Sequence, residues 1–184
     1  MIPVHLDPAF VRIALIGNGA LTLRRLGWLR EGGIEPTVWA ENPSTDLLEQ
    51  AGGSLRQCCP TTEDLASFQV IWIADLPESE AAAFAKTARK LGRLVNVEDV
   101  NEFCDFHTPA VVRRGGLTLS AGTGGASPAA ARAARERLAR AFDPAWGEAL
   151  AEIAVVRRRM KAEGASPQAV SEDAQTRLRA RGLL

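Results

Sequence analysis

Short apolar runs alternate with amphipathic stretches along the first hundred residues. The run Val-Arg-Ile-Ala-Leu-Ile over 11–16 ends abruptly at a glycine, which is typical of a buried parallel strand entering a tight turn. Leucines at helical spacing then predict a helix from Ala20 to about Arg30. The alternation continues with expected strands at 37–40, 54–58, 70–74 and 94–97 and a helix at 78–91. This order predicts an α/β fold with a mostly parallel sheet covered by helices on both faces.

The pattern changes after Asp99. Residues 110–113 and 117–120 predict two strands joined through Gly115-Gly116, which is a hairpin and not another strand-helix-strand unit. Ser127-Pro128 then predicts the start of a helix to about Phe142, because Ser is a good N-cap and Pro suits the first helical position. Further helices are expected over 145–163 and after Ser166-Pro167. The sequence therefore predicts a subdomain junction near residue 100.

Composition narrows the class of protein. A hydrophobic content of 46% suits a soluble globular chain, and the 22 basic residues balance the 22 acidic ones. With no excess of positive charge, nucleic acid is not an expected partner. No apolar run reaches the roughly 18 to 20 residues that span a bilayer, and the opening residues lack a signal-peptide pattern. We expect a cytoplasmic protein without a membrane partner.

The Gly17-Asn18-Gly19 turn carries the first candidate chemistry. It lies between a strand and a helix, where the backbone can approach a pyrophosphate and the helix N-terminus offers free N–H groups. Thr22 stands at the third small position of the dinucleotide fingerprint, which lowers the specificity of the match. Glu41, about 20 residues on, is placed to accept hydrogen bonds from the adenosine ribose and favours NAD over NADP. The alternative is a glycine turn that binds nothing.

Two carboxylates, Glu98 and Asp99, follow the expected strand at 94–97, and Asp105 lies shortly after them. Ligands of open α/β sheets bind at this carboxyl edge, so each of the three is a candidate base, with a solvated carboxylate as the alternative. His107 is a candidate substrate-binding or proton-carrying residue, or a hydrogen-bonded structural one. No cluster has metal-ligand spacing, and we predict no resident metal. Cys58, Cys59 and Cys104 are interpreted as buried or idle thiols.

The glycine-rich stretch before Ser127 is a candidate second anion site, because it leads into a helix N-terminus. The alternative is a connecting loop without a ligand. Together with segments that precede it, this stretch resembles a known protein family. The stretches IALIGNGALTLRRL and LVNVEDVNEFCDFHTPAVVRRGGLTLSAGTGGASPAAAR together resemble the dehydrogenase/ferrochelatase module of siroheme synthase.

The resemblance implies the activity and organisation of that family. It implies oxidation of precorrin-2 to sirohydrochlorin with NAD, and in some members insertion of ferrous iron as a substrate. It further implies a homodimer, with a Rossmann-like NAD-binding domain over 1–106, a dimerisation region over 107–143 and a helical portion over 144–184. A separate uroporphyrinogen methyltransferase is expected in the pathway. The alternative function is a non-catalytic carrier or sensor of NAD or a tetrapyrrole.

The resemblance also assigns residues. Asp99 is the implied catalytic acid/base, and the implied cofactor contacts after the glycine turn and the second strand are Ala20, Leu21, Glu41 and Asn42. The implied tetrapyrrole contacts are Gly122, Thr123, Gly124, Gly125 and Ser127. Because the substrate carries many carboxylates, arginines are plausible clamps for it, namely Arg113, Arg114 and Arg132.

Overall fold

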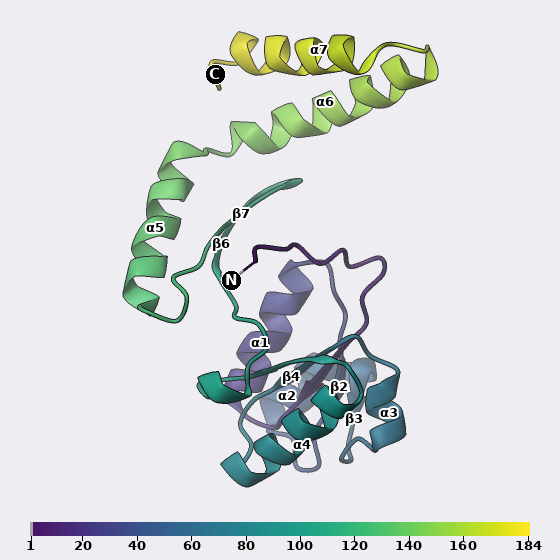
Figure 1. Ribbon diagram of the computed structural model, residues 1–184, viewed down its shortest axis with the longest axis vertical. Helices are drawn as coiled ribbons and strands as arrows, with labels where there is room; N and C mark the ends of the chain where they lie inside the picture. The colour runs from purple at the N-terminus through teal and green to yellow at the C-terminus, as the bar shows by residue number, and fades with distance from the viewer. Residues whose placement is uncertain (1) are drawn as a thin grey trace. The chain divides into compact units, whose positions relative to one another are not determined.

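The computed structural model describes residues 2–184, which divide into one compact unit ending at His107 and a second beginning at Thr108. The first unit is built on a five-stranded sheet in which every neighbouring pair of strands is parallel. Its order is β3-β2-β1-β4-β5, and β2, β3 and β4 are labelled in Figure 1. The strands are β1 (Ile13–Ile16), β2 (Thr37–Trp39), β3 (Leu55–Arg56), β4 (Val70–Ile73) and β5 (Leu94–Val97). The parallel α/β fold predicted from the sequence is confirmed.

Alternate residues of β1 enter two separate apolar layers. Ile13 and Leu15 pack with residues of α1 (Ala20–Glu31) and α2 (Thr45–Ala51). Ala14 and Ile16 pack instead with residues of α3 (Thr62–Ala66) and α4 (Glu78–Lys90). This period of two is the strand geometry that places successive side chains on opposite faces. Helices therefore cover both faces, and every residue of β1 and β4 is buried.

The order of the strands reverses beside β1. The chain runs from β1 outward to β2 and β3, and then returns to place β4 on the other side of β1. In open α/β sheets, the crevice at such a switch point, outside the carboxyl ends of the strands, is where ligands bind. The residues that follow β1 and β4, starting with Gly17 and Ala74, meet at this point.

The second unit combines a hairpin with three helices. β6 (Ala110–Arg114) pairs antiparallel with β7 (Leu117–Ala121), and α5 (Pro128–Ala141), α6 (Ala145–Ala162) and α7 (Pro167–Ala180) follow. Arg114 fastens the hairpin to the end of α5, since its guanidinium donates to the carbonyls of Phe142 (2.8 Å) and Ala139 (3.1 Å). The hairpin turn also lies against α6, where a Cβ on Gly147 would come 2.9 Å from the Arg114 carbonyl carbon.

Helices α6 and α7 lie side by side and run antiparallel (Figure 1). Glu152 of α6 forms ion pairs with Arg177 of α7 and with Arg181, the residue that follows α7, and the distance between the Arg181 guanidinium and Glu152 Oε2 is 2.6 Å. Hydrogen bonds from these two arginines lower the pKa of Glu152. The pairing of the two helices is therefore tied to an ionised carboxylate.

Several boundaries differ from those expected. The strand predicted over 54–58 is reduced to Leu55–Arg56, and the helices α2 and α3 were not predicted. Their starts were nonetheless marked in the sequence by Ser44, which caps Leu47 N–H, and by the capping box of Thr61 and Asp64. Within residues 2–184, no helix is long and apolar enough to cross a membrane.

Candidate cofactor and catalytic site

The glycine turn after β1 is closed in on several sides. Gly17 N–H donates to the Trp39 carbonyl (2.9 Å), and Ser44 N–H donates to the Asn18 carbonyl (3.1 Å). Gly17 has a φ of +152°, and a Cβ there would lie 2.0 Å from the Ala74 carbonyl oxygen. Position 17 therefore requires glycine for both backbone conformation and space.

Asp75, which follows β4, caps the helix that the glycine turn opens. Its Oδ2 accepts hydrogen bonds from Thr22 N–H (2.7 Å) and Thr22 Oγ1 (2.9 Å), and its carboxylate carbon would lie 2.9 Å from a Cβ on Gly19. Asp75 has a positive φ of 56°, an uncommon conformation for a residue other than glycine. Asp75 was not among the site residues predicted from the sequence, although a carboxylate directly after a buried apolar run is a visible signal.

The contact with Asp75 explains the departure at the third fingerprint position. Thr22 is fully buried, so it fits where a small residue is expected, and its hydroxyl is satisfied by Asp75. Asp75 occupies one of the N–H groups at the start of α1, while the N–H groups that precede Thr22 have no partner inside the helix. Those remaining groups are the ones that an anionic ligand can use.

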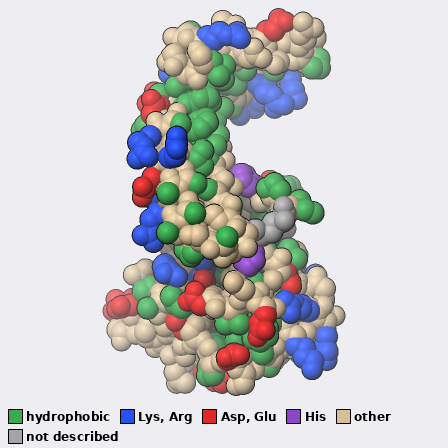
Figure 2. Space-filling view, turned by 60° about the vertical axis from the view of Figure 1, so that its left-hand side comes forward, with side chains coloured by type: hydrophobic (Ala, Val, Ile, Leu, Met, Phe, Trp, Pro, Cys, Tyr) green, Lys and Arg blue, Asp and Glu red, His purple; other side chains and the backbone are tan. Residues whose placement is uncertain are grey.

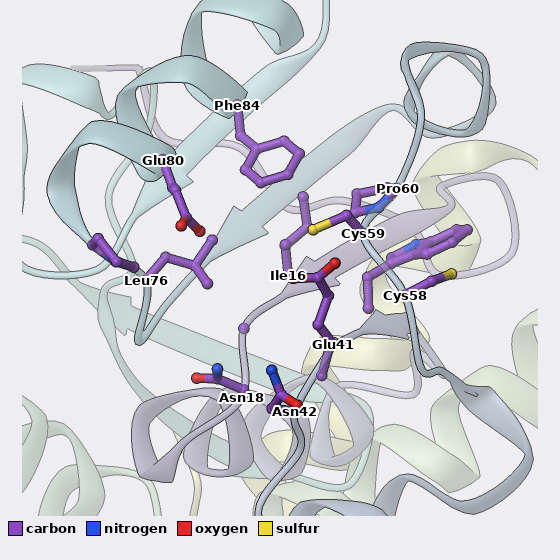
Figure 3. A pocket seen from close by; sticks show the side chains of 14 residues that line it. Ile16, Asn18, Glu41, Asn42, Cys58, Cys59, Pro60, Leu76, Glu80 and Phe84 are labelled. Carbon is purple, nitrogen blue, oxygen red and sulfur yellow. The ribbon is translucent and has the colours of Figure 1, made fainter.

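A cavity of about 230 Å³ opens beside the glycine turn. Gly17 and Asn18 line it from β1, and Glu41 and Asn42 line it from the end of β2. Figure 3 shows Asn18 and Asn42 beside the start of the helix, with Leu76 and Glu80 across the cavity. Its volume is below the roughly 300–1,000 Å³ of pockets for drug-sized ligands, so it would enclose only part of a dinucleotide.

These residues fit an adenosine dinucleotide. Gly17 lets the turn pack tightly against the Ala74 carbonyl, the start of α1 retains free N–H groups, and the Glu41 carboxylate lines the same cavity. The structure thus brings together four of the seven predicted cofactor residues in one cavity lining: Gly17, Asn18, Glu41 and Asn42. Gly19, Ala20 and Leu21 lie at the adjoining helix start and do not line the cavity.

Cys58 and Cys59 also line this cavity, and both are exposed. We predicted buried or idle thiols, and the first alternative is wrong for these two, because the loop from β3 to α3 passes over the open carboxyl edge of the sheet. Figure 3 shows the Cys59 sulfur beside the Glu41 carboxylate. Partial burial and this carboxylate raise the pKa of the Cys59 thiol. A protonated thiol can donate a hydrogen bond to Glu41.

The three candidate carboxylates after β5 have different surroundings. Glu98 forms an ion pair with Arg25 of α1, and Asp105 forms one with Arg89 of α4 at 2.9 Å. Asp105 Oδ2 also accepts a hydrogen bond from Val95 N–H (3.0 Å). Asp99 is exposed, and no described residue from 2 to 184 forms a side-chain hydrogen bond or ion pair with it. Of the three, Asp99 is the carboxylate left available for a ligand.

The chain after Asp99 folds back onto β5. Asn96 donates from its side-chain amide to the Phe106 carbonyl (2.8 Å), and Asp105 N–H donates to the Val95 carbonyl (2.8 Å). Half-buried Cys104 accepts a hydrogen bond from Val97 N–H at 3.3 Å, and burial raises the pKa of its thiol. These contacts give Cys104 a structural place, and they fix both ends of the segment that carries Asp99. Exposed His107 ends the unit.

The predicted tetrapyrrole loop belongs to the second unit and folds on itself. Ser127 accepts from Ala130 N–H (3.2 Å) as the N-cap of α5, and Thr123 Oγ1 accepts from Ser127 N–H (3.3 Å). Gly124 and Gly125 have φ values of 66° and 81° and are exposed. Arg132 is exposed on α5, whereas Arg114 is committed to the end of that helix. The loop's role in binding stays a prediction.

Comparison with known proteins decides the family of the first unit. The sequence model of the family described as putative NAD(P)-binding matches residues 4–110. The chain belongs to this NAD(P)-binding family. The turn and cavity at the carboxyl edge therefore lie in an NAD(P)-binding domain, as the glycine pattern predicted.

The sequence similarity to known proteins extends beyond this domain. The siroheme synthase of Methylococcus capsulatus is 31% identical over 171 residues, covering 91% of this chain and 36% of the relative. The siroheme synthase of Nitrosococcus oceani is 29% identical over 163 residues, covering 87% of this chain and 35% of the relative. The chain thus spans about a third of the length of these curated relatives. The resemblance predicted from the two sequence stretches is confirmed.

A solved structure shares the fold of the whole chain. It is titled "SirC, precorrin-2 dehydrogenase" and matches with a TM-score of 0.71 at 23% identity, covering 96% of this chain and 88% of that one. At this identity the match shows the fold.

Within residues 2–184, the NAD(P)-binding chain contains no group of three or more His, Cys, Asp or Glu side chains placed to hold a metal ion.

Proposed function

We propose that this chain oxidises precorrin-2 to sirohydrochlorin with NAD, and that Asp99 accepts the proton released in the reaction. The observation that carries the proposal is the availability of Asp99. It follows a strand of the same parallel sheet that presents the glycine turn, and its neighbours Glu98 and Asp105 are both engaged in ion pairs. The siroheme synthase relatives and the fold shared with a precorrin-2 dehydrogenase support the choice of substrate.

The residues around the cavity have separate roles in this proposal. NAD, when bound, supplies a hydride acceptor. The glycine turn and the start of α1 hold the diphosphate, and the Glu41 carboxylate accepts hydrogen bonds from the adenosine ribose. Glu41 would repel the 2′-phosphate of NADP, which supports NAD as the preferred cofactor. Asp99 holds the proton lost when the macrocycle is oxidised.

The charge of the second unit supports a polycarboxylate substrate. Residues 108–184 contain 13 Arg and Lys against 7 Asp and Glu, a net charge of +6, while residues 1–107 contain 9 against 15, a net charge of −6. The overall neutrality therefore conceals two oppositely charged parts. Figure 2 shows Lys and Arg side chains spread over the helices of the second unit. Arg113, Arg132 and the amides of the glycine-rich loop are the proposed contacts for the substrate carboxylates.

Further parts of the proposal follow the family resemblance. We propose a cytoplasmic homodimer in which 107–143 forms the dimerisation region and 144–184 the helical portion. Iron insertion into sirohydrochlorin stays a prediction, with ferrous iron as substrate and His107 as a candidate participant.

The direct test mixes the purified protein anaerobically with precorrin-2 and NAD. We expect NADH and the sirohydrochlorin spectrum to form together. Replacement of Asp99 by Asn should lower kcat by about 10²- to 10⁴-fold, the usual contribution of a general base, and leave NAD affinity unchanged. Glu102→Gln, an exposed carboxylate three residues away, is the matched control and should retain turnover. Binding of both ligands without NADH formation would instead favour a carrier or sensor.

A further inference from the structure

A buried ion pair lies directly beside Asp99. Arg25 Nε donates to Glu98 Oε1 at 2.6 Å, and the two side chains are only 9% and 11% exposed. The Arg25 guanidinium also lies over the rings of Trp28 and Trp72, at 5.0 Å and 5.6 Å from their centroids. The pair therefore connects α1 to the residue after β5, beside the rings of Trp28 and Trp72.

Burying two charges is not an efficient way to stabilise a protein. The desolvation of both groups offsets most of their attraction, and apolar side chains of similar volume often give equal or greater stability. The rings of Trp28 and Trp72 stabilise the Arg25 cation by about 0.5–2 kcal/mol, but the ion pair with Glu98 adds little net stability to that. The presence of an ion pair at this position therefore points to a role other than stability.

The backbone at Asp99 shows what the pair constrains. Asp99 has a positive φ of 63°, a left-handed conformation that is uncommon in residues other than glycine, although Asp adopts it more readily than most. On one side, Glu98 N–H donates to the Ile73 carbonyl (2.9 Å) while its side chain is held by Arg25. On the other side, Val100 N–H donates to the Val97 carbonyl (3.2 Å). The Glu98 side chain is thus held by Arg25 of α1, while the Asp99 side chain remains exposed.

We propose that Arg25 and Glu98 are positioning residues that hold the Asp99 carboxylate in its reactive place. The proposal rests on the function proposed above, in which Asp99 accepts a proton. Loss of the pair frees the turn, and misplacement of a catalytic group by about 1 Å lowers turnover on the order of 100-fold. The NAD cavity is not lined by either residue, so cofactor affinity should change little.

Four variants separate positioning from stability. Arg25→Met and Glu98→Met each leave one buried charge unpaired and should lower the Tm, whereas the double variant removes both charges and should recover it. We expect kcat to fall about 10- to 100-fold in the double variant, with the KM for NAD unchanged within about twofold. Arg25→Lys retains the charge and should recover part of kcat. A double variant with both the Tm and the kcat of the wild type would refute the positioning role, since turnover would then not need the pair.

A second measurement does not need the substrate. Amide hydrogen exchange at Val100 reports the turn around Asp99, and exchange at Leu15, a fully buried residue of the central strand β1, is the internal control. In the double variant we expect Val100 to exchange about tenfold faster or more, with Leu15 unchanged, because a tenfold change corresponds to about 1.4 kcal/mol of local stability. Unchanged protection at Val100 would overturn the positioning role whatever the substrate is.

The failure of the two proposals can be told apart. If Asp99→Asn turns precorrin-2 over at the wild-type rate, Asp99 is not the base, and the positioning role is refuted with it. If Asp99→Asn is inactive but the double methionine variant is fully active, the base stands and the positioning role alone is refuted. If the wild type does not oxidise precorrin-2, the proposed function fails, and the exchange experiment still decides whether the pair orders the turn.

Discussion

Replacing Thr22 by Val tests how the glycine turn is built. Valine has nearly the same shape as threonine but lacks the hydroxyl that donates to Asp75 Oδ2 at 2.9 Å. A hydrogen bond to a charged group contributes about 1.5–3 kcal/mol, and Thr22 is fully buried, so water cannot replace the lost donor. We therefore expect the free energy of unfolding of the first unit to fall by about 1.5–3 kcal/mol.

Urea denaturation followed by tryptophan fluorescence measures this change. The protein has four tryptophans, of which Trp146 alone lies in the second unit, so a Trp146→Phe background confines the signal to the first. With urea m-values of about 1–3 kcal/mol per molar, the midpoint should fall by about 1 M. Loss of the Thr22 hydroxyl should also loosen the contact between Asp75 and the start of α1, and so weaken NAD binding.

Thr22→Ser is the matched control. Serine keeps the hydroxyl and loses one buried methyl group, which costs about 0.8 kcal/mol by transfer alone. The expected order of stability is therefore wild type, then serine, then valine. A valine variant as stable as the serine variant would refute the role assigned to the Thr22–Asp75 hydrogen bond.

Three further predictions address other parts of the molecule. Gly17→Ala should abolish NAD binding measured by calorimetry and lower the Tm, because the new methyl would lie 2.0 Å from a backbone oxygen; a stable variant that binds NAD would contradict the close-approach argument. Alkylation of Cys59 by a maleimide, followed by intact mass in a Cys58→Ser background, should be slowed by NAD, since the thiol lines the cofactor cavity; equal rates with and without NAD would place the cofactor elsewhere. Glu152→Gln should reduce the acid sensitivity of the α6–α7 pairing seen by circular dichroism. The folded-state pKa of Glu152 is lowered by its arginine partners, so its stabilisation is present at neutral pH and is lost as pH falls below the ordinary glutamate value of about 4.3; identical acid transitions in the two proteins would contradict this.

The elements that the sequence predicted well depend on local physics. The strand at 70–74 was visible because a run of buried apolar residues is continuous, and the α1 helix because its leucines share one face. The two missed helices are short, α3 having five residues and α2 seven, and in them local capping replaces a long periodic pattern. The strand predicted over 54–58 was too long because the chain leaves the sheet after Arg56, and Cys58 and Cys59 line the cavity instead.

The residues of the candidate site also divide into those indicated by local spacing and those distinguished only by distant partners. The glycine turn and Glu41 were found from sequence because their geometry is set by a few adjacent residues and a fixed spacing within one strand-helix-strand unit. Glu98, Asp99 and Asp105 could not be distinguished, because what separates them is their partners, Arg25 and Arg89, on two different helices. The resemblance selected Asp99, and the structure adds a physical reason for that choice.

The sequence by itself determined the order of strands and helices, the need for glycine at position 17 and the charge of each half of the chain, since all of these follow from residue identity and short-range spacing. Only the tertiary structure decided which distant residues meet. Asp75 reaches Thr22 across 53 positions, and Glu98 reaches Arg25 across 73. Both contacts exist because β4 and β5 add to the sheet on the same side of β1, and no local pattern specifies that strand order.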